Sequence, residues 1–427
     1  MRKALFLSIC FFYCLYADAQ WETVPNAPTA MRFDDVSFIN EHTGWIAQGN
    51  DLYKTTDGGN TWQHHSTLPA TGNGYVRSVE FLNDTIGLYG TLADINNPAS
   101  LYRTTDGGLT FTNINILANT DDGMCGMAHF GNTVIAVGTW SSAVPHFYKS
   151  VDAGLNWTSY NLSSIATGLV DCYMFDDNNF LVCGISAPDQ KAFIARTSDG
   201  GTTWQQVAYT SVAAVSYMWK MFFLDDGVGF ASVQNCPVIF KTTDYGFTWT
   251  EINLGLITAT GLGAIGALND SVIWVGNQFE HGMYGTTDGG ENWTFYSAFG
   301  ENMDRMVRVD DEHLLCVGST VYKYTGSSNN VPVDSSLLSQ HHFVTAKPNP
   351  FINEMKVHMN LFQSSYILLD LVDGHGKIVK HLFSGTLPAG DTDKAFATPE
   401  ITSGMYTLLF RSNEEFKSVK VVKGSGQ

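Results

Sequence analysis

The sequence predicts an all-β protein on three observations: its composition, an eight-residue pattern repeated through most of the chain, and a change of composition near residue 330. Of 427 residues, 41 are glycine and 13% are aromatic, whereas only 15% are charged; roughly 25% are charged in an average soluble domain. This balance favours many short strands joined by tight turns and excludes a disordered chain. The net charge of −18 leaves no extended basic surface for nucleic acid.

The first nineteen residues predict a secretory signal peptide. Arg2 and Lys3 form a basic start, residues 4–16 are an apolar run, and residues 17–19 (Ala-Asp-Ala) are a small-x-small cleavage signal. The apolar run is shorter than the ~20 residues that a membrane anchor needs. No later segment is long and apolar enough to span a membrane. We therefore expect a protein that is secreted or held on the cell surface, outside the outer membrane.

An eight-residue box of the form Thr-Thr-Asp-Gly-Gly-x-Thr-Trp recurs six times. The spacings between its aspartates are 49, 46, 47, 45 and 44 residues, a period that fits one four-stranded blade of a β-propeller. The box aspartates are Asp57, Asp106, Asp152, Asp199, Asp244 and Asp288.

We interpret each box as a tight turn between two strands. The carboxylate accepts hydrogen bonds from nearby backbone N–H groups, the second glycine supplies a positive φ, and the final Trp or Phe begins the next strand and packs between blades. Calcium needs six to eight converging oxygens, whereas each box offers one carboxylate on its own blade. We therefore expect the six aspartates to be structural, and we predict no metal site and no cofactor.

A second motif precedes each box and consists of a strand, an acidic or Asn-rich turn, and another strand. Its seventh copy, residues 307–324, is followed by neither a box nor a fourth strand. Residues 21–24 (Trp-Glu-Thr-Val) are similar to the strands that follow the boxes, so we predict that they complete the last blade and remove its exposed edge. The prediction is a seven-bladed β-propeller over residues 20–325, with six blades as the alternative.

The boxes and the motif before them resemble the BNR or Asp-box repeats of sialidases, sortilin-type receptors and some glucanases. With Gly-Trp at residues 44–45 and Tyr-Lys-Thr-Thr-Asp-Gly-Gly-Asn-Thr-Trp at residues 53–62, they look most similar to the photosystem II assembly-factor propeller family. The resemblance implies the fold and leaves the function open, because families that share the box do unrelated things.

The tail differs from the repeats in composition. Residues 20–330 contain 12 Lys and Arg against 31 Asp and Glu, whereas residues 331–427 contain nine of each. The polar stretch 326–342 is typical of a linker, and short alternating strands follow in residues 343–423. The predicted strands, with a hairpin turn at residues 373–376, form a small Ig-like β-sandwich; they are 356–361, 366–372, 377–383, 405–410 and 416–422.

Five landmarks in this tail resemble the type A C-terminal sorting domain of the type IX secretion system of Bacteroidetes. They are residues 347–351 (Lys-Pro-Asn-Pro-Phe), 373–376 (Asp-Gly-His-Gly), 387–390 (Leu-Pro-Ala-Gly), 403–406 (Ser-Gly-Met-Tyr) and the basic strand 417–423. The resemblance implies that the signal peptide carries the protein across the inner membrane and that residues 343–423 direct it across the outer membrane, with the secretion machinery as partner. An ordinary Ig-like adhesion module is the alternative.

Candidate ligand-binding residues lie where the first strand of each blade begins, because these strands line the channel of a propeller and the adjacent loops form its mouth. Aligning the repeats places one residue of each at this level, with Lys220, Asp304 and Arg308 alongside. These side chains either contact a ligand or are paired with one another in solvent. The candidates are Asp34, Arg77, Asp171, Trp219 and Arg305.

Catalytic chemistry finds little support in the sequence. Sialidase chemistry needs three converging arginines, and Arg32, Arg77 and Arg305 could converge, but no Phe-Arg-Ile-Pro element is present. A glucanase needs two opposed carboxylates, for which Asp34 and Asp171 are candidates. We therefore expect no catalytic residues and predict a secreted or cell-surface, monomeric propeller that binds a protein or glycan. The alternative is a secreted glycoside hydrolase, glucanase- or sialidase-like, acting on polysaccharide.

Cysteine usage does not predict a disulfide framework, because the five cysteines after the signal peptide are scattered and odd in number. Most should be small buried residues in strands, although a bond between Cys125 and Cys172 on neighbouring repeats is conceivable. The five are Cys125, Cys172, Cys183, Cys236 and Cys316.

Overall fold

The protein folds into strands and turns. A computed structural model describes residues 21–69, 75–92, 100–114, 123–138, 144–212, 215–255, 261–326, 343–347, 351–361, 363–373, 377–412 and 416–424. No helix occurs in these ranges, so the all-β prediction is confirmed. Accordingly, none of the described segments forms an apolar helix that could cross a membrane. The predicted signal peptide (residues 1–19) and all but the first residue of the predicted linker (326–342) lie outside the described residues.

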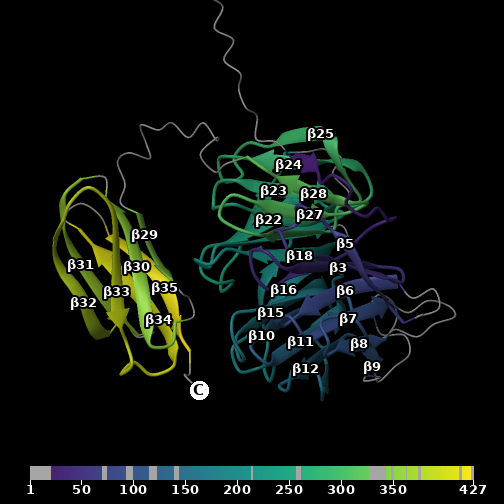
Figure 1. The fold of residues 1–427 in the computed structure, drawn as a ribbon, viewed down its shortest axis with the longest axis horizontal. Coiled ribbons are helices and arrows are strands. Elements are labelled where there is room, and N and C mark those ends of the chain that lie inside the picture. Colours follow the sequence, from purple (N-terminus) through teal and green to yellow (C-terminus); the bar gives the residue numbers. More distant parts are fainter. Residues whose placement is uncertain are drawn as a thin grey trace, which may run out of the picture.

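Within the described part of residues 21–324, seven antiparallel sheets of four strands each follow one another (Figure 1). The first strands are β2 (Val36–Phe38), β6 (Tyr75–Phe81), β10 (Gly126–Phe130), β14 (Ala166–Met174), β18 (Tyr217–Phe223), β22 (Leu262–Ala267) and β26 (Arg305–Arg308). The second strands are β3 (Gly44–Gln48), β7 (Gly87–Leu92), β11 (Thr133–Gly138), β15 (Phe180–Ser186), β19 (Gly229–Gln234), β23 (Ile273–Asn277) and β27 (Leu314–Val317). The third strands are β4 (Asp51–Thr55), β8 (Leu101–Thr104), β12 (His146–Ser150), β16 (Ala192–Thr197), β20 (Val238–Thr242), β24 (His281–Thr286) and β28 (Val321–Tyr324). The fourth strands are β5 (Gln63–Thr67), β9 (Thr112–Asn113), β13 (Thr158–Asn161), β17 (Gln205–Tyr209), β21 (Thr250–Asn253), β25 (Thr294–Glu301) and β1 (Trp21–Thr23).

The sheets close into a ring. Each first strand contacts the first strand of the next sheet, and the last of them, β26, contacts β2. The fourth strand of the last sheet is β1, whose Trp21 lies opposite Tyr324 of β28. The predicted pairing of the N-terminal strand with the last repeat is therefore confirmed, and it joins the two ends of the ring.

Apolar packing between sheets explains which strands form the interior. The second and third strands are mostly apolar and buried, whereas fourth strands such as β5 and β13 are polar and largely exposed. The aromatic residue of a box fills the space between two sheets, as predicted. Trp204 lies edge-on to Phe147 of the preceding sheet, with ring centroids 5.5 Å apart, and to Phe180 of its own sheet at 5.6 Å.

The boxes form one repeated hydrogen-bonded turn. In the first box, Asp57 Oδ1 accepts from the Thr55 hydroxyl at 2.8 Å and from the Thr61 backbone N–H at 2.9 Å, and Gly59 N–H donates to Thr55 Oγ1 at 2.9 Å. The other five boxes repeat these bonds. Each box carboxylate thus serves its own turn, and no group of three metal-ligating side chains occurs among the described residues.

Contacts from the boxes also fasten neighbouring sheets together. Gly59 has φ +80°, and a Cβ there would lie 2.3 Å from Leu315 Cδ1 of the preceding sheet, so only glycine fits. At the same seam between the last and first sheets, Lys323 of the last sheet donates to Asn60 Oδ1 of the first at 2.7 Å. Arg103 likewise donates to a box carbonyl of the next sheet at 2.8 Å.

Residues 343–424 form two further antiparallel sheets that share their own apolar core, shown in yellow tones in Figure 1. One sheet has the order β29-β30-β33 and the other β32-β31-β34-β35. All five strands predicted here are present, and β31 and β32 pair as the predicted hairpin, whose turn residues 374–376 lie outside the described ranges. The strands are β29 (Phe343–Lys347), β30 (Glu354–Leu361), β31 (Ser365–Val372), β32 (Ile378–Leu387), β33 (Gly390–Ala397), β34 (Gly404–Arg411) and β35 (Phe416–Lys423).

Strands β29 and β33 were not predicted. In β33, exposed and half-exposed residues alternate and no position is fully buried. Its sequence, Gly-Asp-Thr-Asp-Lys-Ala-Phe-Ala, therefore lacks the continuous apolar face by which a strand is recognised from sequence alone.

Protonation of the box carboxylates should weaken the ring in acid. Hydrogen bonds from Thr110 lower the pKa of Asp106 to about 2, so its ionised form stabilises the fold above the unfolded pKa of about 3.9, and this contribution is lost as the pH falls through about 2. We expect Asp106→Asn to melt a few degrees below the unchanged protein at about pH 5, and this gap to close toward about pH 2. Tryptophan fluorescence measures the melting of the ring, because all ten tryptophans lie between Trp21 and Trp293. A gap that is constant with pH would contradict the assigned role.

Candidate functional site

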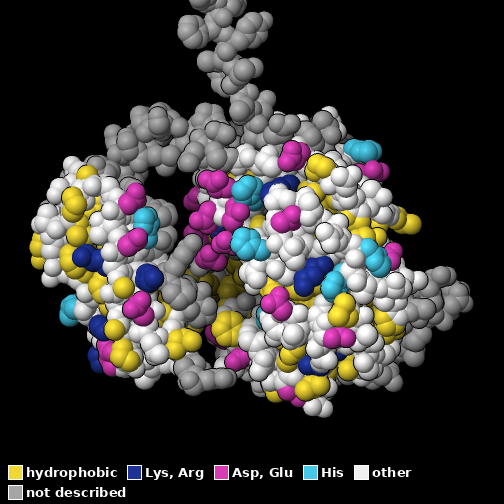
Figure 2. Space-filling view, viewed as in Figure 1, with side chains coloured by type: hydrophobic (Ala, Val, Ile, Leu, Met, Phe, Trp, Pro, Cys, Tyr) yellow, Lys and Arg dark blue, Asp and Glu magenta, His cyan; other side chains and the backbone are white. Residues whose placement is uncertain are grey.

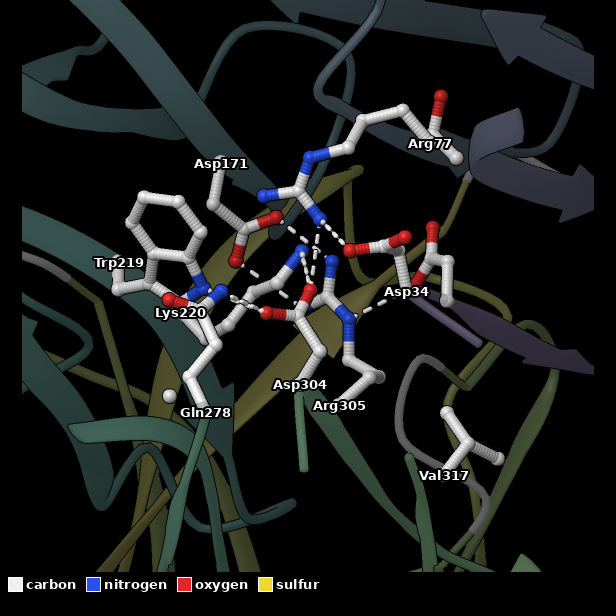
Figure 3. Close-up of polar contacts among 12 residues, drawn as sticks. Asp34, Arg77, Asp171, Trp219, Lys220, Gln278, Asp304, Arg305 and Val317 are labelled. Atoms are coloured by element: carbon white, nitrogen blue, oxygen red, sulfur yellow. Dashed lines mark hydrogen bonds and ion pairs between the residues drawn. The ribbon is translucent and has the colours of Figure 1, made fainter. Parts of the chain in front are cut away.

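The five residues predicted at the channel mouth meet at the centre of the ring (Figure 3). They come from five different sheets but occupy equivalent places, at or just before the first strand of each. All five take part in two neighbouring groups of hydrogen bonds and ion pairs, one around Asp304 and one around Arg305, which we together call the network; the five are Asp34, Arg77, Asp171, Trp219 and Arg305.

Asp304 is the hub of this network. Its Oδ2 accepts from Arg77 Nη1 at 2.7 Å, and its Oδ1 accepts from the indole N–H of Trp219 at 2.7 Å and from the amide of Gln278. The ammonium group of Lys220 lies 3.6 Å from Asp304 Oδ2. The Arg77 guanidinium also lies 5.0 Å from the centroid of the Trp219 ring, a distance typical of a cation–π contact.

Arg305 binds two further carboxylates. Its Nη2 and Nη1 donate to the two oxygens of Asp171 at 2.7 and 3.0 Å, and its Nε donates to Asp35 Oδ1 at 2.8 Å. Asp171 Oδ2 also accepts the backbone N–H of Met221 at 2.9 Å. This bidentate geometry is the strongest form of an arginine–carboxylate pair.

Asp34 completes the network on the side of the predicted mouth. Its Oδ1 lies 2.6 Å from Arg77 Nη1 and 2.7 Å from Arg32 Nη2. The network therefore balances four carboxylates with four cations, namely Asp34, Asp35, Asp171 and Asp304 with Arg32, Arg77, Lys220 and Arg305.

Burial determines the electrostatics of these groups. Burial alone would raise the pKa of Asp304, but the positive charges of Arg77 and Lys220 hold that pKa well below its usual range. Burial raises the pKa of Asp34 to about 6, against the opposing charge of Arg77. Asp34, Arg77, Asp171, Trp219 and Asp304 are each no more than 2% exposed.

One expectation was that these five side chains contact a ligand directly at the channel mouth, and the observed geometry differs from it. The polar groups of Asp34, Arg77, Asp171 and Trp219 face one another rather than solvent, so direct contact with a ligand requires that the network open. Lys220 and Asp304, which were expected beside the five candidates, belong to the network. Asp35 and Gln278 also belong to it, but they were not predicted from the sequence. Gln278 follows a second strand, outside the aligned first strands, so the alignment of first strands did not include it.

The residues considered for sialidase or glucanase catalysis are already paired with oppositely charged side chains of the protein itself. Arg32 and Arg77 share Asp34, and Arg305 belongs to the neighbouring group, but each of the three binds a carboxylate of the chain itself. Asp34 and Asp171, the candidate glucanase pair, are each held by an arginine and are buried. A glycosidic bond must lie between two accessible carboxyl groups for hydrolysis, and this structure provides no such access to the pair.

One side of the network carries exposed apolar side chains. Met31 is 81% and Phe279 is 63% exposed. The guanidinium of Arg32 lies 6.0 Å from the ring centroids of both Tyr75 and Phe279, and Asn302 donates to the carbonyl of Met31 at 3.1 Å. These residues lie before or at the start of first strands, or in the loops between second and third strands, which is the predicted mouth face. We call the group Met31, Arg32, Tyr75 and Phe279 the mouth platform.

On the other side of the network the channel widens into a cavity of about 570 Å³. Arg305 and Asp35 lie at its inner end, and the turns after the first strands surround its opening. The sequence did not predict this cavity. Cys172 lies in its wall. The expected burial of the cysteines is confirmed, and none of the five forms a disulfide in this structure, Cys125 and Cys172 included.

Comparison with known proteins defines the class of the ring. Residues 15–171 match the family model described as photosynthesis system II assembly factor YCF48. No curated protein matches the sequence. Similar solved structures include YCF48 bound to D1 peptide, which is 19% identical with a TM-score of 0.55 and coverage of 72% of this chain and 97% of that chain. YCF48 from Cyanidioschyzon merolae is 17% identical, with a TM-score of 0.54 and coverage of 71% and 98%.

Enzymes of the same architecture are also similar. The GH74 enzyme from Niastella koreensis is 13% identical, with a TM-score of 0.54 and coverage of 94% of this chain and 74% of that chain. At such identities the likeness shows the fold alone. Together with the repeated boxes, it establishes the ring as a BNR-type β-propeller, a class whose members include both assembly factors and glycoside hydrolases.

Removing one charge from the network should destabilise the ring strongly. We expect Arg77→Met to lower the free energy of unfolding by about 3–5 kcal/mol, because Asp34 and Asp304 would lose a buried partner. Urea denaturation followed by tryptophan fluorescence measures this change. The control is Arg308→Met, which breaks a pair with the exposed carboxylate of Asp311 and should cost less than about 1 kcal/mol. Equal losses for the two variants would contradict a stabilising role of the network.

Proposed function

We propose that this protein is an exported, non-enzymatic, seven-bladed propeller that binds a protein or glycan ligand at the mouth of its central channel. One observation carries the proposal: the carboxylates considered for hydrolysis are paired with cations in a buried network, while Met31 and Phe279 of the mouth platform are exposed beside that network. The seven four-stranded sheets and the contact between β26 and β2 support the blade count.

The mouth platform has the chemistry of a recognition surface. Exposed aromatic rings bind the apolar faces of sugars and of peptide side chains, and arginine adds hydrogen bonds to carboxylates. Arg32 belongs to the platform and also pairs with Asp34. The network therefore holds the platform in place, so that Asp34, Arg77, Asp171, Trp219 and Arg305 support binding from beneath the surface. The YCF48 structure with a D1 peptide is a propeller of this class with a bound peptide.

The tail supports the proposed route of export. Its five sequence landmarks occur in the order of a type IX sorting domain, and residues 343–423 build two sheets with a core of their own. With a signal peptide at residues 1–19 for the inner membrane, we propose secretion through the type IX system to the cell surface or the medium. The secretion machinery is then a second partner, and the propeller acts as a monomer without nucleic acid.

A glycoside hydrolase is the second candidate, and one observation favours it. The pKa of Asp34 is raised to about 6, a value that suits a general acid near neutral pH. Catalysis by Asp34 would require a substrate that opens its pairs with Arg32 and Arg77.

Substitution in the mouth platform should abolish ligand binding. The probes are a peptide array and affinity electrophoresis with soluble polysaccharides, xyloglucan among them. We expect the unchanged protein to bind at least one probe and Phe279→Ala to bind it at least about tenfold more weakly, because the exposed ring supplies central contact area. Phe295→Ala is the matched control, since Phe295 is also an exposed phenylalanine but lies on an outer strand.

Several outcomes would contradict this proposal. Absence of binding to every probe would contradict the ligand-binding function, and equal weakening by both alanine variants would contradict the site. Release of reducing sugar from a bound polysaccharide, lost in Asp34→Asn, would replace binding by hydrolysis as the function.

The tail should be sufficient for export. In a bacterium with a type IX system, we expect removal of residues 343–427 to leave the propeller in the periplasm. Fusion of residues 326–427 to a periplasmic fluorescent reporter should carry that reporter outside the cell. Immunoblots of periplasm and medium measure both. A reporter that stays in the periplasm would show that the tail is an adhesion module or another structural domain.

A further inference from the structure

The cavity on the far side of the network is a second, chemically different site. Its lining comes from the ends of the first strands β2, β6, β10, β14, β18 and β26 and from the turns that follow β2, β18 and β26. The mouth platform lies at the other ends of these strands, with the ion network between the two. We propose that the cavity binds a basic segment of a partner protein by holding the side chain of a lysine or arginine across its opening.

The side-chain charges around this cavity favour a positively charged ligand. Six carboxylates line it against two arginines, namely Asp35, Glu41, Glu80, Asp225, Asp310 and Asp311 against Arg305 and Arg308. The surface view shows Asp and Glu side chains gathered along one side of the ring rather than spread evenly (Figure 2). An anionic ligand would meet this excess of negative charge with repulsion.

The carboxylates at the opening are accessible and share one counterion. The side chains of Asp225 and Asp311 are 81% and 73% exposed. Arg308 reaches both, with Nη2 2.5 Å from Asp311 Oδ1 and Nη1 3.8 Å from Asp225 Oδ2. Two carboxylates facing one guanidinium leave one negative charge uncompensated at the rim, which an incoming ammonium or guanidinium group can neutralise.

Deeper in the cavity the pairs are already complete. Glu80 lies 2.7 Å from His129 Nδ1, and Asp35 is bound by Arg305. A charged group is therefore best held near the rim, where Asp225 and Asp311 lie, while the aliphatic part of its side chain extends across the apolar wall at the opening.

The wall suits the aliphatic stem of such a side chain. Four methionines line the cavity: Met127, Met174, Met221 and Met306. Thioether side chains are flexible and polarisable, and they occur in surfaces that adapt to varied peptide side chains. Lysine and arginine bury their methylene groups along apolar surface while their charge stays at a polar edge. The volume of about 570 Å³ lies within the range of ligand sites.

Fluorescence anisotropy with the full-length protein and a labelled tetralysine peptide tests the proposal. We expect the double variant Asp225→Lys/Asp311→Lys to bind at least about tenfold more weakly. The matched control, Glu22→Lys/Asp189→Lys, changes the net charge equally on exposed positions away from the cavity, and it should change the affinity by less than about threefold. Equal effects of the two double variants would show attraction to net charge alone and overturn the site.

Removal of Arg308 provides the opposite test. Arg308→Gln frees Asp225 and Asp311, so we expect the peptide to bind about fivefold or more tightly. Lys54→Gln lowers the positive charge equally at a third strand and should leave the affinity nearly unchanged. Weaker binding to Arg308→Gln, or no binding of the peptide to the unchanged protein, would overturn the proposal. Loss of binding in Phe279→Ala as well would place the peptide at the mouth platform instead.

Discussion

The buried ion network at the centre of the ring is the interaction on which the other features depend. It joins side chains from sheets that are far apart in sequence; Arg77 and Asp304, for example, are separated by 227 residues. A buried charge without its partner is costly, so each charged member is stable only while the residues paired with it are in place. The network therefore fixes how the first strands approach the channel, and it determines where the channel is closed.

The ring itself is closed by contacts of ordinary strength that recur at every interface. The seam between the last and first sheets combines the pairing of β1 with β28, the bond from Lys323 to Asn60 and the close approach of Gly59 to Leu315. Equivalent glycine contacts occur at the other boxes. The seam is therefore built like the other interfaces, and the repeat continues through the point where the chain ends meet.

Periodicity explains what the sequence could predict. The boxes, the closing strand and the convergence of residues such as Asp34 and Arg305 follow from the repeat, because equivalent positions meet at one level of a ring. Pairing at that level was one of two alternatives, but the burial of the pairs and the choice of partners could not be predicted, since they depend on which side chains from different sheets reach one another. Gln278 enters from a loop outside the aligned strands. Strand β33 was missed because its polar sequence shows no apolar face.

The neutrality of the network has a consequence for the two ends of the channel. Its four cations cancel four carboxylates, so the acidic excess of the propeller must lie elsewhere. The boxes meet the acidic turns at one end of the sheets, as the bond from Gly58 N–H to the His42 carbonyl shows. That end contains the cavity and is negative, whereas Arg32 and the exposed ring of Phe279 lie at the other. A ligand passing from one end to the other would have to separate buried ion pairs such as that of Arg305 with Asp171. The two ends are therefore physically separate, and each can recognise a different chemistry.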